Sequence, residues 1–224
     1  MQPYYQTDTI TIYHANCLDV LSTLTAAECV LVTDPPYGLA HSSNRTSALY
    51  GNTAAEYGNG SIANDTTTAF RDAVLQWYGV GPALVFGSWK VARPAGIRQL
   101  LIWDKGEASG MGDLSIPWKP SHEEIYVLGS GFSGRRTTGV LRAYVPARIS
   151  FGRLHPNEKP VSLMKMLIQK CPDLTILDPF MGSGSTLAAA KQLGRRAIGI
   201  ELDERYCEVA ANRLQQEVMA LEVG

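Results

Sequence analysis

Seven short apolar runs recur along the chain, and between several of them the apolar residues follow a helical period. The runs span residues 9–13, 29–33, 83–87, 99–103, 124–128, 174–177 and 196–200. This alternation is typical of a largely parallel sheet with helices on both faces, because parallel strands are joined by crossover helices. A length of 224 residues fits one large domain. We therefore predict a single α/β domain over residues 1–224, with a mostly parallel seven-stranded sheet.

Two segments depart from the alternation. Ser, Thr, Asn and Gly fill 16 of the 29 positions in 41–69, where no apolar period is present. Unstructured segments of this length are uncommon inside a domain and usually form lids or disordered insertions, so we predict a mobile loop there. After residue 124, Gly129, Gly131 and Gly134 follow in quick succession, which predicts an antiparallel hairpin at the sheet edge.

A glycine-rich turn follows the apolar run 174–177. The segment 175–186 predicts a strand, a tight turn and a helix that ends at Gly194. Gly182 and Gly184 permit positive φ and let a ligand approach the backbone. Glu201 ends the next apolar run, where a carboxylate can accept the hydroxyls of a ribose. The pattern indicates a nucleotide-type cofactor site, with a plain strand-to-helix turn as the alternative because Leu187 replaces the third glycine of a dinucleotide fingerprint.

The residues Asp34, Pro35, Pro36 and Tyr37 follow the apolar run 29–33. An exocyclic amine on a heterocycle is a poor nucleophile, since its lone pair is delocalised into the ring. The Asp34 carboxylate and the Pro35 carbonyl can accept the amine hydrogens and stabilise the positive charge that grows on nitrogen. Consecutive prolines keep these carbonyls unpaired and rigid. We expect the Tyr37 ring to stack on the base and its hydroxyl to contribute little; the alternative is a simple Pro-Pro turn.

Taken together, these segments resemble the β class of S-adenosylmethionine-dependent DNA amino-methyltransferases, in particular its small phage members. The motif at 34–37 precedes the glycine motif at 178–184, which is the permuted order of that class, and His155–Pro160 is similar to its HPxxKP element. The resemblance covers residues 10–40 and 150–215, with weaker agreement at 102–106 and 121–125. It implies a permuted Rossmann-like fold and transfer of a methyl group to adenine N6 or cytosine N4.

The resemblance also implies the site residues. Asp34, Pro35, Pro36 and Tyr37 would hold the target base, and Asp34 would also border the cofactor. The other cofactor-binding positions would be Asn16, Cys17, Lys159, Ser162, Asp178, Phe180, Gly182, Gly184, Thr186, Glu201 and Leu202. Ala15-Asn16 replaces the Gly-Asp pair of the family, so we expect weaker binding at the cofactor adenine. No metal is implied.

From these residues we predict a cytoplasmic, site-specific DNA adenine-N6 methyltransferase of restriction-modification type. It would act on double-stranded DNA with the target base flipped out, because the amine is buried within the duplex. Residues 104–150 would form a minimal target-recognition region, with 104–121 as a loop over the cofactor cleft. A homodimer is compatible with the resemblance, and no membrane partner is expected because no apolar run approaches the length of a membrane span.

Charge is distributed unevenly, although the net charge is only −1. Residues 88–165 hold 12 Lys and Arg against 6 Asp and Glu, whereas both flanking regions are acidic. A basic segment can neutralise phosphates, and a scattered solvated face is the alternative. Trp89 and Trp118, beside Lys90 and Lys119, are candidate nucleic-acid contacts.

Several alternatives remain from the sequence. Cytosine-N4 methylation uses the same residues, a DNA- and cofactor-binding module with weak catalysis would retain them, and RNA or protein-glutamine methylation fits the motif order less well. Ring-carbon cytosine methylation is excluded because no Pro-Cys pair supplies its nucleophile. The four widely spaced cysteines and four histidines lack the spacing of a disulfide framework or a metal site.

Overall fold

The computed structural model describes residues 1–37, 67–106, 112–144 and 158–222. These residues form one sheet with the strand order β1-β2-β9-β8-β3-β4-β6-β5-β7. The strands are β1 (Tyr5–Gln6), β2 (Ile10–His14), β3 (Cys29–Thr33), β4 (Ala83–Gly87), β5 (Ile97–Asp104), β6 (His122–Leu128), β7 (Val140–Arg142), β8 (Thr175–Asp178) and β9 (Ala197–Glu201). All seven predicted runs are strands, and the predicted mixed, mostly parallel α/β fold is confirmed.

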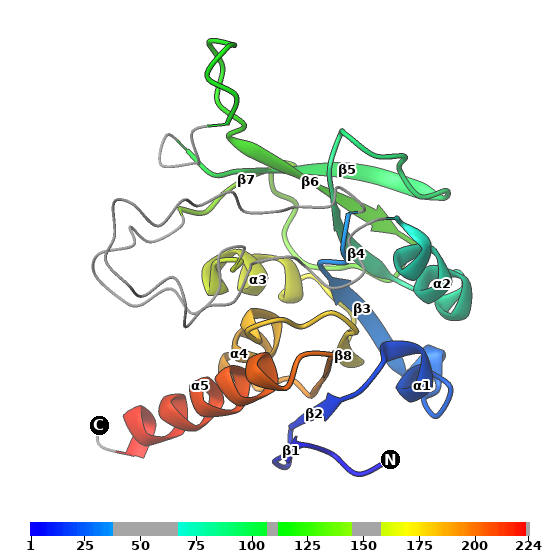
Figure 1. The fold of residues 1–224 in the computed structure, drawn as a ribbon, viewed down its shortest axis with the longest axis vertical. Coiled ribbons are helices and arrows are strands. Elements are labelled where there is room, and N and C mark those ends of the chain that lie inside the picture. Colours follow the sequence, from blue (N-terminus) through cyan, green and yellow to red (C-terminus); the bar gives the residue numbers. More distant parts are fainter. Residues whose placement is uncertain (38–66, 107–111, 145–157, 223–224) are drawn as a thin grey trace.

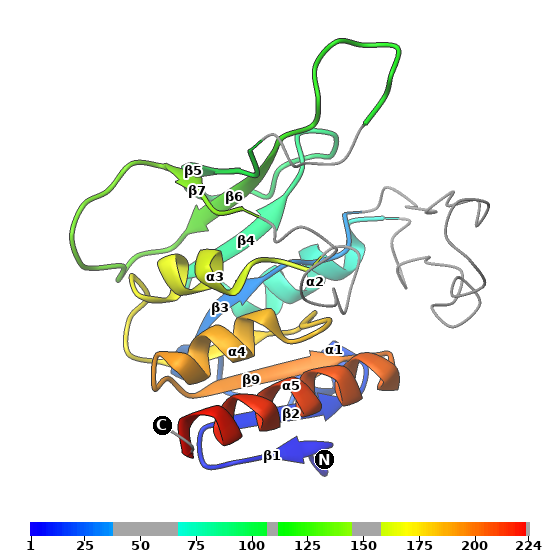
Figure 2. The same ribbon diagram turned by 90° about the vertical axis from the view of Figure 1, so that its left-hand side faces the viewer.

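Helices cover both faces of the sheet (Figures 1 and 2). The elements are α1 (Cys17–Leu21), the 3-10 turn η1 (Ala26–Glu28), α2 (Ala69–Tyr78), α3 (Val161–Ile168), α4 (Ser185–Gln192) and α5 (Glu204–Glu222). Side chains of β3 alternate between the two layers: Val30 and Val32 belong to the core that includes α3, α4 and α5, whereas Cys29 and Leu31 belong to the core of α1 and α2. This period of two, with one face of the strand packed on each layer, explains why the run 29–33 is buried throughout.

The sequence-based prediction differs from the structure in two details. Nine strands rather than seven pair in the described residues, because β1 and β7, of two and three residues, are too short to give an apolar period. The glycines after residue 128 do not form a hairpin. They lead instead to β7, which pairs in parallel with β5. The antiparallel pairs are β6 with β4, β6 with β5, and β1 with β2.

The strand order creates a switch point between β8 and β3. From β8 the chain passes through α4 to β9 on one side, and from β3 it passes to β4 on the other side. In open parallel sheets the loops diverge at such a point and leave a crevice beyond the carboxyl ends of the strands. The two motifs found in the sequence follow β3 and β8, so both lie at this point.

Other predicted segments fall partly outside the described residues. Of the predicted loop 41–69, only 67–69 are described, and α2 begins there at Ala69. The predicted target-recognition region 104–150 contains the described excursion 112–121, β6, the segment 129–139 and β7. In the described residues, no helix is long and apolar enough to cross a membrane.

Candidate active site

The glycine turn is held by Asp178, at the carboxyl end of β8. Its Oδ1 accepts hydrogen bonds from the Thr33 hydroxyl at 2.7 Å and the Phe180 amide at 3.2 Å, and its Oδ2 accepts from the Thr186 hydroxyl at 2.5 Å. Burial raises the pKa of Asp178 to about 6. The carboxylate therefore joins β8, β3 and the first turn of α4 through neutral donors.

The two glycines of the turn are required for different structural reasons. Both have positive φ, 51° at Gly182 and 78° at Gly184. A Cβ on Gly184 would lie 2.8 Å from the Cβ of Ala210 in α5, whereas a Cβ on Gly182 would have no atom of another described residue within 4 Å, its chain neighbours aside. Gly184 thus allows the turn to pack on α5, while Gly182 borders open space where a ligand can approach the backbone.

Glu201 faces the glycine turn from the end of β9, as the sequence predicted. Its Oε1 accepts from the amides of Leu202 and Asp203 at 2.8 and 2.9 Å, and its Oε2 accepts from the Gly182 amide at 3.0 Å. Burial raises the pKa of this carboxyl. Because each carboxylate oxygen has about two acceptor positions, Oε1 is filled by the backbone and Oε2 retains one position.

Asp34 and Tyr37 lie directly beyond β3. Pro35 is buried, and Asp34, Pro36 and Tyr37 are partly exposed. The Tyr37 hydroxyl donates to Asp34 Oδ1 at 2.6 Å, a contact that the sequence-based expectation for this hydroxyl did not include. Burial raises the pKa of Asp34 above its ordinary value, although the neighbouring Lys159 opposes that rise.

Lys159 is 7% exposed and lies between two carboxylates. Its ammonium forms an ion pair with Asp34 and a second with Glu123 at 3.2 Å, and it lies 5.0 Å from the ring centroid of Phe86. Glu123 also forms an ion pair with Lys105. Burial acts to lower the pKa of Lys159, but the two carboxylates outweigh it and hold that pKa above its ordinary value. The ammonium is therefore charged.

Sequence reasoning did not identify Glu123 or Lys105 as site residues. Both belong to segments, 121–125 and 102–106, that resemble the family only weakly. They become neighbours of Asp34 because Asp104 and His122 are paired in the β5–β6 ladder, and that ladder is joined to β4. The available signal was an acidic residue at the start of a strand, which is too common to single out one residue.

The remaining predicted cofactor residues border the same carboxyl edge with varied exposure. Asn16 caps α1, its Oδ1 accepting from the Leu18 amide at 3.0 Å. Cys17 is buried, and burial raises its thiol pKa to about 11. Ser162 is exposed in the first turn of α3, and Leu202 is 47% exposed. Residues 155–157 of the HPxxKP-like element lie outside the described residues.

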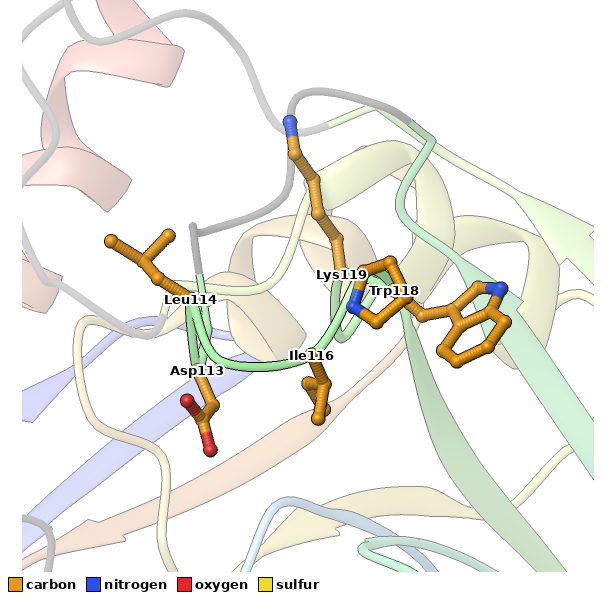
Figure 3. Close-up of a pocket in the computed structure, with 6 residues that line it drawn as sticks. Asp113, Leu114, Ile116, Trp118 and Lys119 are labelled. Carbon is orange, nitrogen blue, oxygen red and sulfur yellow. The ribbon is translucent and has the colours of Figure 1, made fainter.

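The excursion between β5 and β6 carries exposed apolar side chains. Figure 3 shows Leu114, Ile116 and Trp118 pointing in different directions around a shallow hollow that Asp113, Pro117 and Lys119 also line. Trp118 is 78% exposed. Figure 2 shows the excursion projecting away from the β8–α4 turn, so the prediction that 104–121 forms a loop over the cofactor cleft is not met by its described part.

A mostly parallel sheet with a glycine turn and a buried aspartate at its switch point is the arrangement in which α/β folds bind nucleotide-type ligands. Residues 97–212 match the family described as DNA methylase, the N6/N4 methylases. Over 214 residues the chain is 30% identical to YubD of Escherichia coli (strain K12), a methylase by name, and the match covers 93% of this chain and 92% of YubD. The chain belongs to the N6/N4 DNA methylase family.

Solved structures show the same fold. The M1.HpyAVI–SAM complex superposes with a TM-score of 0.60 at 22% identity, covering 91% of this chain and 99% of that chain. The PvuII DNA methyltransferase (cytosine-N4-specific) superposes with a TM-score of 0.69 at 16% identity, covering 95% of this chain and 88% of that chain.

A local sequence match links 81 residues to M.HinfI of Haemophilus influenzae at 40% identity, over 32% of this chain and 23% of that enzyme. The predicted cofactor, S-adenosylmethionine, is the one that this family uses.

Proposed function

We propose that this N6/N4 family member is a β-class enzyme that methylates adenine N6 in double-stranded DNA. The observation that carries the proposal is the hydrogen bond between Thr33 and Asp178. It holds the end of β3, where Asp34 begins the catalytic motif, against the glycine turn after β8. An acceptor for the target amine and a cofactor turn are thereby adjacent, and the aspartate motif precedes the glycine motif in the chain.

The residues of the glycine turn fit the proposed cofactor. Gly182 leaves open space beside the backbone, and Glu201 Oε2 retains one acceptor position for a ribose hydroxyl. Asn16 would border the cofactor adenine, with Cys17 and Leu202 on the same side. Asp178, Phe180, Gly184 and Thr186 would surround the methionine part, with Lys159 and Ser162 near its carboxylate. When bound, S-adenosylmethionine supplies an electrophilic methyl group.

Asp34 and Pro35 would prepare the target amine. Asp34 accepts from Tyr37 on one oxygen and from Lys159 on the other, and each oxygen keeps a further acceptor position. One of these positions and the Pro35 carbonyl would receive the two amine hydrogens. The carboxylate would then stabilise the positive charge that develops on nitrogen, and the proton would leave to water afterwards.

The basic middle of the chain would contact phosphates. Arg135 and Arg136 are exposed between β6 and β7, and neither forms an ion pair with another described residue. Arg93 and Arg142, by contrast, are paired with Glu124 and Asp104. Reversing the charge of Arg135 and Arg136 should weaken binding to all DNA sequences and reduce its salt dependence. An unchanged Kd of the double variant, measured by fluorescence anisotropy, would remove this surface from the DNA contact.

A labelled-cofactor assay tests the function. The protein is incubated with methyl-labelled S-adenosylmethionine and, separately, with DNA, RNA and protein, and the labelled product is digested to its components. N6-methyladenine from DNA is the expected product. N4-methylcytosine would assign the other base of the family, and label in RNA or protein alone would overturn the proposal. Two-aminopurine at the target position reports base flipping, which costs a few kcal/mol.

A further inference from the structure

Four charged side chains form an alternating series beside the catalytic aspartate. The order is Asp34, Lys159, Glu123 and Lys105, with each carboxylate in contact with an ammonium. Their side chains are 27%, 8%, 18% and 21% exposed, respectively. Three of the four come from other parts of the fold than the 34–37 motif: Lys105 follows β5, Glu123 lies in β6 and Lys159 precedes α3. The series is closed by Tyr37, whose hydroxyl lies 3.4 Å from Glu123 Oε2.

Fold stability alone does not explain this series. Buried ion pairs lose much of their Coulomb energy to desolvation, and apolar side chains of similar size often stabilise a protein as well or better. The series does, however, contact the one carboxylate that the proposed reaction needs. Phe86 and Trp103 lie beneath it, with the Lys159 ammonium 5.0 and 5.9 Å from their ring centroids. Water is thereby kept from one side of the ammonium, which strengthens its interaction with the carboxylates.

We propose that Glu123 is a positioning residue for methyl transfer, which shares the Lys159 ammonium and so keeps negative charge on Asp34 available to the target amine. The inference rests on the proposed function. With Glu123 present, the three groups Asp34, Lys159 and Glu123 carry one net negative charge. Without it, Lys159 neutralises Asp34 alone, and the carboxylate stabilises a developing positive charge less well. Lys105, on the far side of Glu123, limits how strongly Glu123 attracts Lys159.

The arrangement determines how Asp34 titrates. Within the described residues, the charged and titratable groups around Asp34 are Lys159, Tyr37, Glu123, Lys105 and Asp178. Glu123 acts to raise the pKa of Asp34, and Lys159 acts to lower it. Glu123→Gln should therefore lower the pKa of Asp34, while Lys105→Gln should raise it because Glu123 is then less compensated. A residue that serves only packing would not produce opposite shifts from two neighbouring variants.

Two measurements separate the inference from the proposed function. Carbon-detected NMR of labelled aspartate, with Asp34→Asn for assignment, follows the Asp34 carboxyl directly and needs no substrate. Single-turnover methylation across pH gives the rate plateau and its acidic limb. Glu123→Gln should reduce the plateau by about 10- to 100-fold and move the acidic limb to lower pH, with cofactor Kd changed less than about threefold. Lys105→Gln should move the limb to higher pH.

Glu124→Gln is the matched control. Glu124 is the next residue of β6, but it is paired with Arg93 and accepts from the Tyr126 hydroxyl at 2.7 Å, away from Asp34. This variant should lower the melting temperature without moving the titration of Asp34. If Glu123→Gln does not fold, Lys105→Gln still tests the inference, because a rise in the pKa of Asp34 measured by NMR would support it and a fall or no change would overturn it.

The outcomes are distinct. An Asp34 titration that does not move in the Glu123 and Lys105 variants, or that moves in the same direction in both, overturns the inference. If the two variants shift the Asp34 titration in opposite directions but the wild type methylates no nucleic acid, the proposed function is overturned and the electrostatic coupling is established. A rate loss in Glu123→Gln that only follows its melting temperature would assign Glu123 a structural role.

Discussion

The two halves of the candidate site hold their carboxylates in opposite ways. Beside the glycine turn, the donors to Asp178 and Glu201 among the described residues are hydroxyls and backbone amides. Beside the catalytic motif, Asp34 and Glu123 are in contact with lysine ammonium groups. Neutral donors fix a loop in place and respond little to added charge, whereas ion pairs redistribute when charge develops nearby. The first half is thus suited to holding a shape, and the second to stabilising a changing charge.

Asp34→Asn tests the charge-bearing half and should have the largest effect. The variant keeps an acceptor oxygen but loses the negative charge that offsets the developing charge on nitrogen. We expect methyl transfer to fall by about 10²- to 10³-fold, while cofactor Kd stays within about tenfold. Single-turnover rates at saturating DNA and titration calorimetry of the cofactor measure the two quantities. Near-normal turnover of the variant would show that the charge of Asp34 is not needed for methyl transfer. The proposed difference between the two halves of the site would then not hold.

Asp178→Asn tests the half that holds the turn, through the pH dependence of stability. The folded-state pKa of Asp178 is raised from 3.8 to about 6, so the folded state binds the proton more tightly than the unfolded state. Its contribution to the free energy of unfolding is fully present below about pH 4 and is lost as pH rises through about 6. A change of this size corresponds to on the order of 3 kcal/mol.

The Asn variant has no such titration. We therefore expect the wild type to lose about 2 to 3 kcal/mol relative to Asp178→Asn between pH 4 and pH 7. Urea denaturation of both proteins at several pH values gives the difference, and titrations elsewhere in the chain cancel in it. Parallel pH dependence of the two proteins would show that the hydrogen bonds from Thr33 and Thr186 keep Asp178 ionised.

Gly184→Ala and Gly182→Ala compare two positions within the turn and should have the smallest effects. Each variant places a Cβ on a residue with positive φ, which costs about 1 kcal/mol. Gly184→Ala also meets Ala210 at 2.8 Å, so we expect a total loss of about 2 kcal/mol from the free energy of unfolding. Gly182→Ala meets no described atom within 4 Å, so beyond the cost of its φ its main effect should be weaker cofactor binding.

Thermal denaturation and cofactor titration of both glycine variants measure the contrast. The expected pattern is a lower melting temperature in Gly184→Ala and a higher cofactor Kd in Gly182→Ala. Equal cofactor affinity in the wild type and Gly182→Ala would mean that the open space beside Gly182 is not where the ligand approaches.

Local patterns in the sequence determined much of this protein. The side chains of the run 29–33 alternate between two cores. Asp203 caps α5, its Oδ1 accepting from the Arg205 amide at 3.0 Å, and Gly194, just after α4, has positive φ. Each of these features depends on residues a few positions apart, so spacing and residue type suffice to predict it. The glycine turn and Glu201 belong to the same class, because one strand-turn-helix-strand unit brings them together.

Tertiary structure alone decided the surroundings of Asp34. Its contact with Lys159 joins residues 125 positions apart, and the contact of Tyr37 with Glu123 spans 86. The strand order brings these residues together, because β6 pairs with β4, beside β3, and β5 pairs with β6. A charge in a sequence does not specify its partner, because ion pairs have no periodicity and depend on where the chain places the opposite charge.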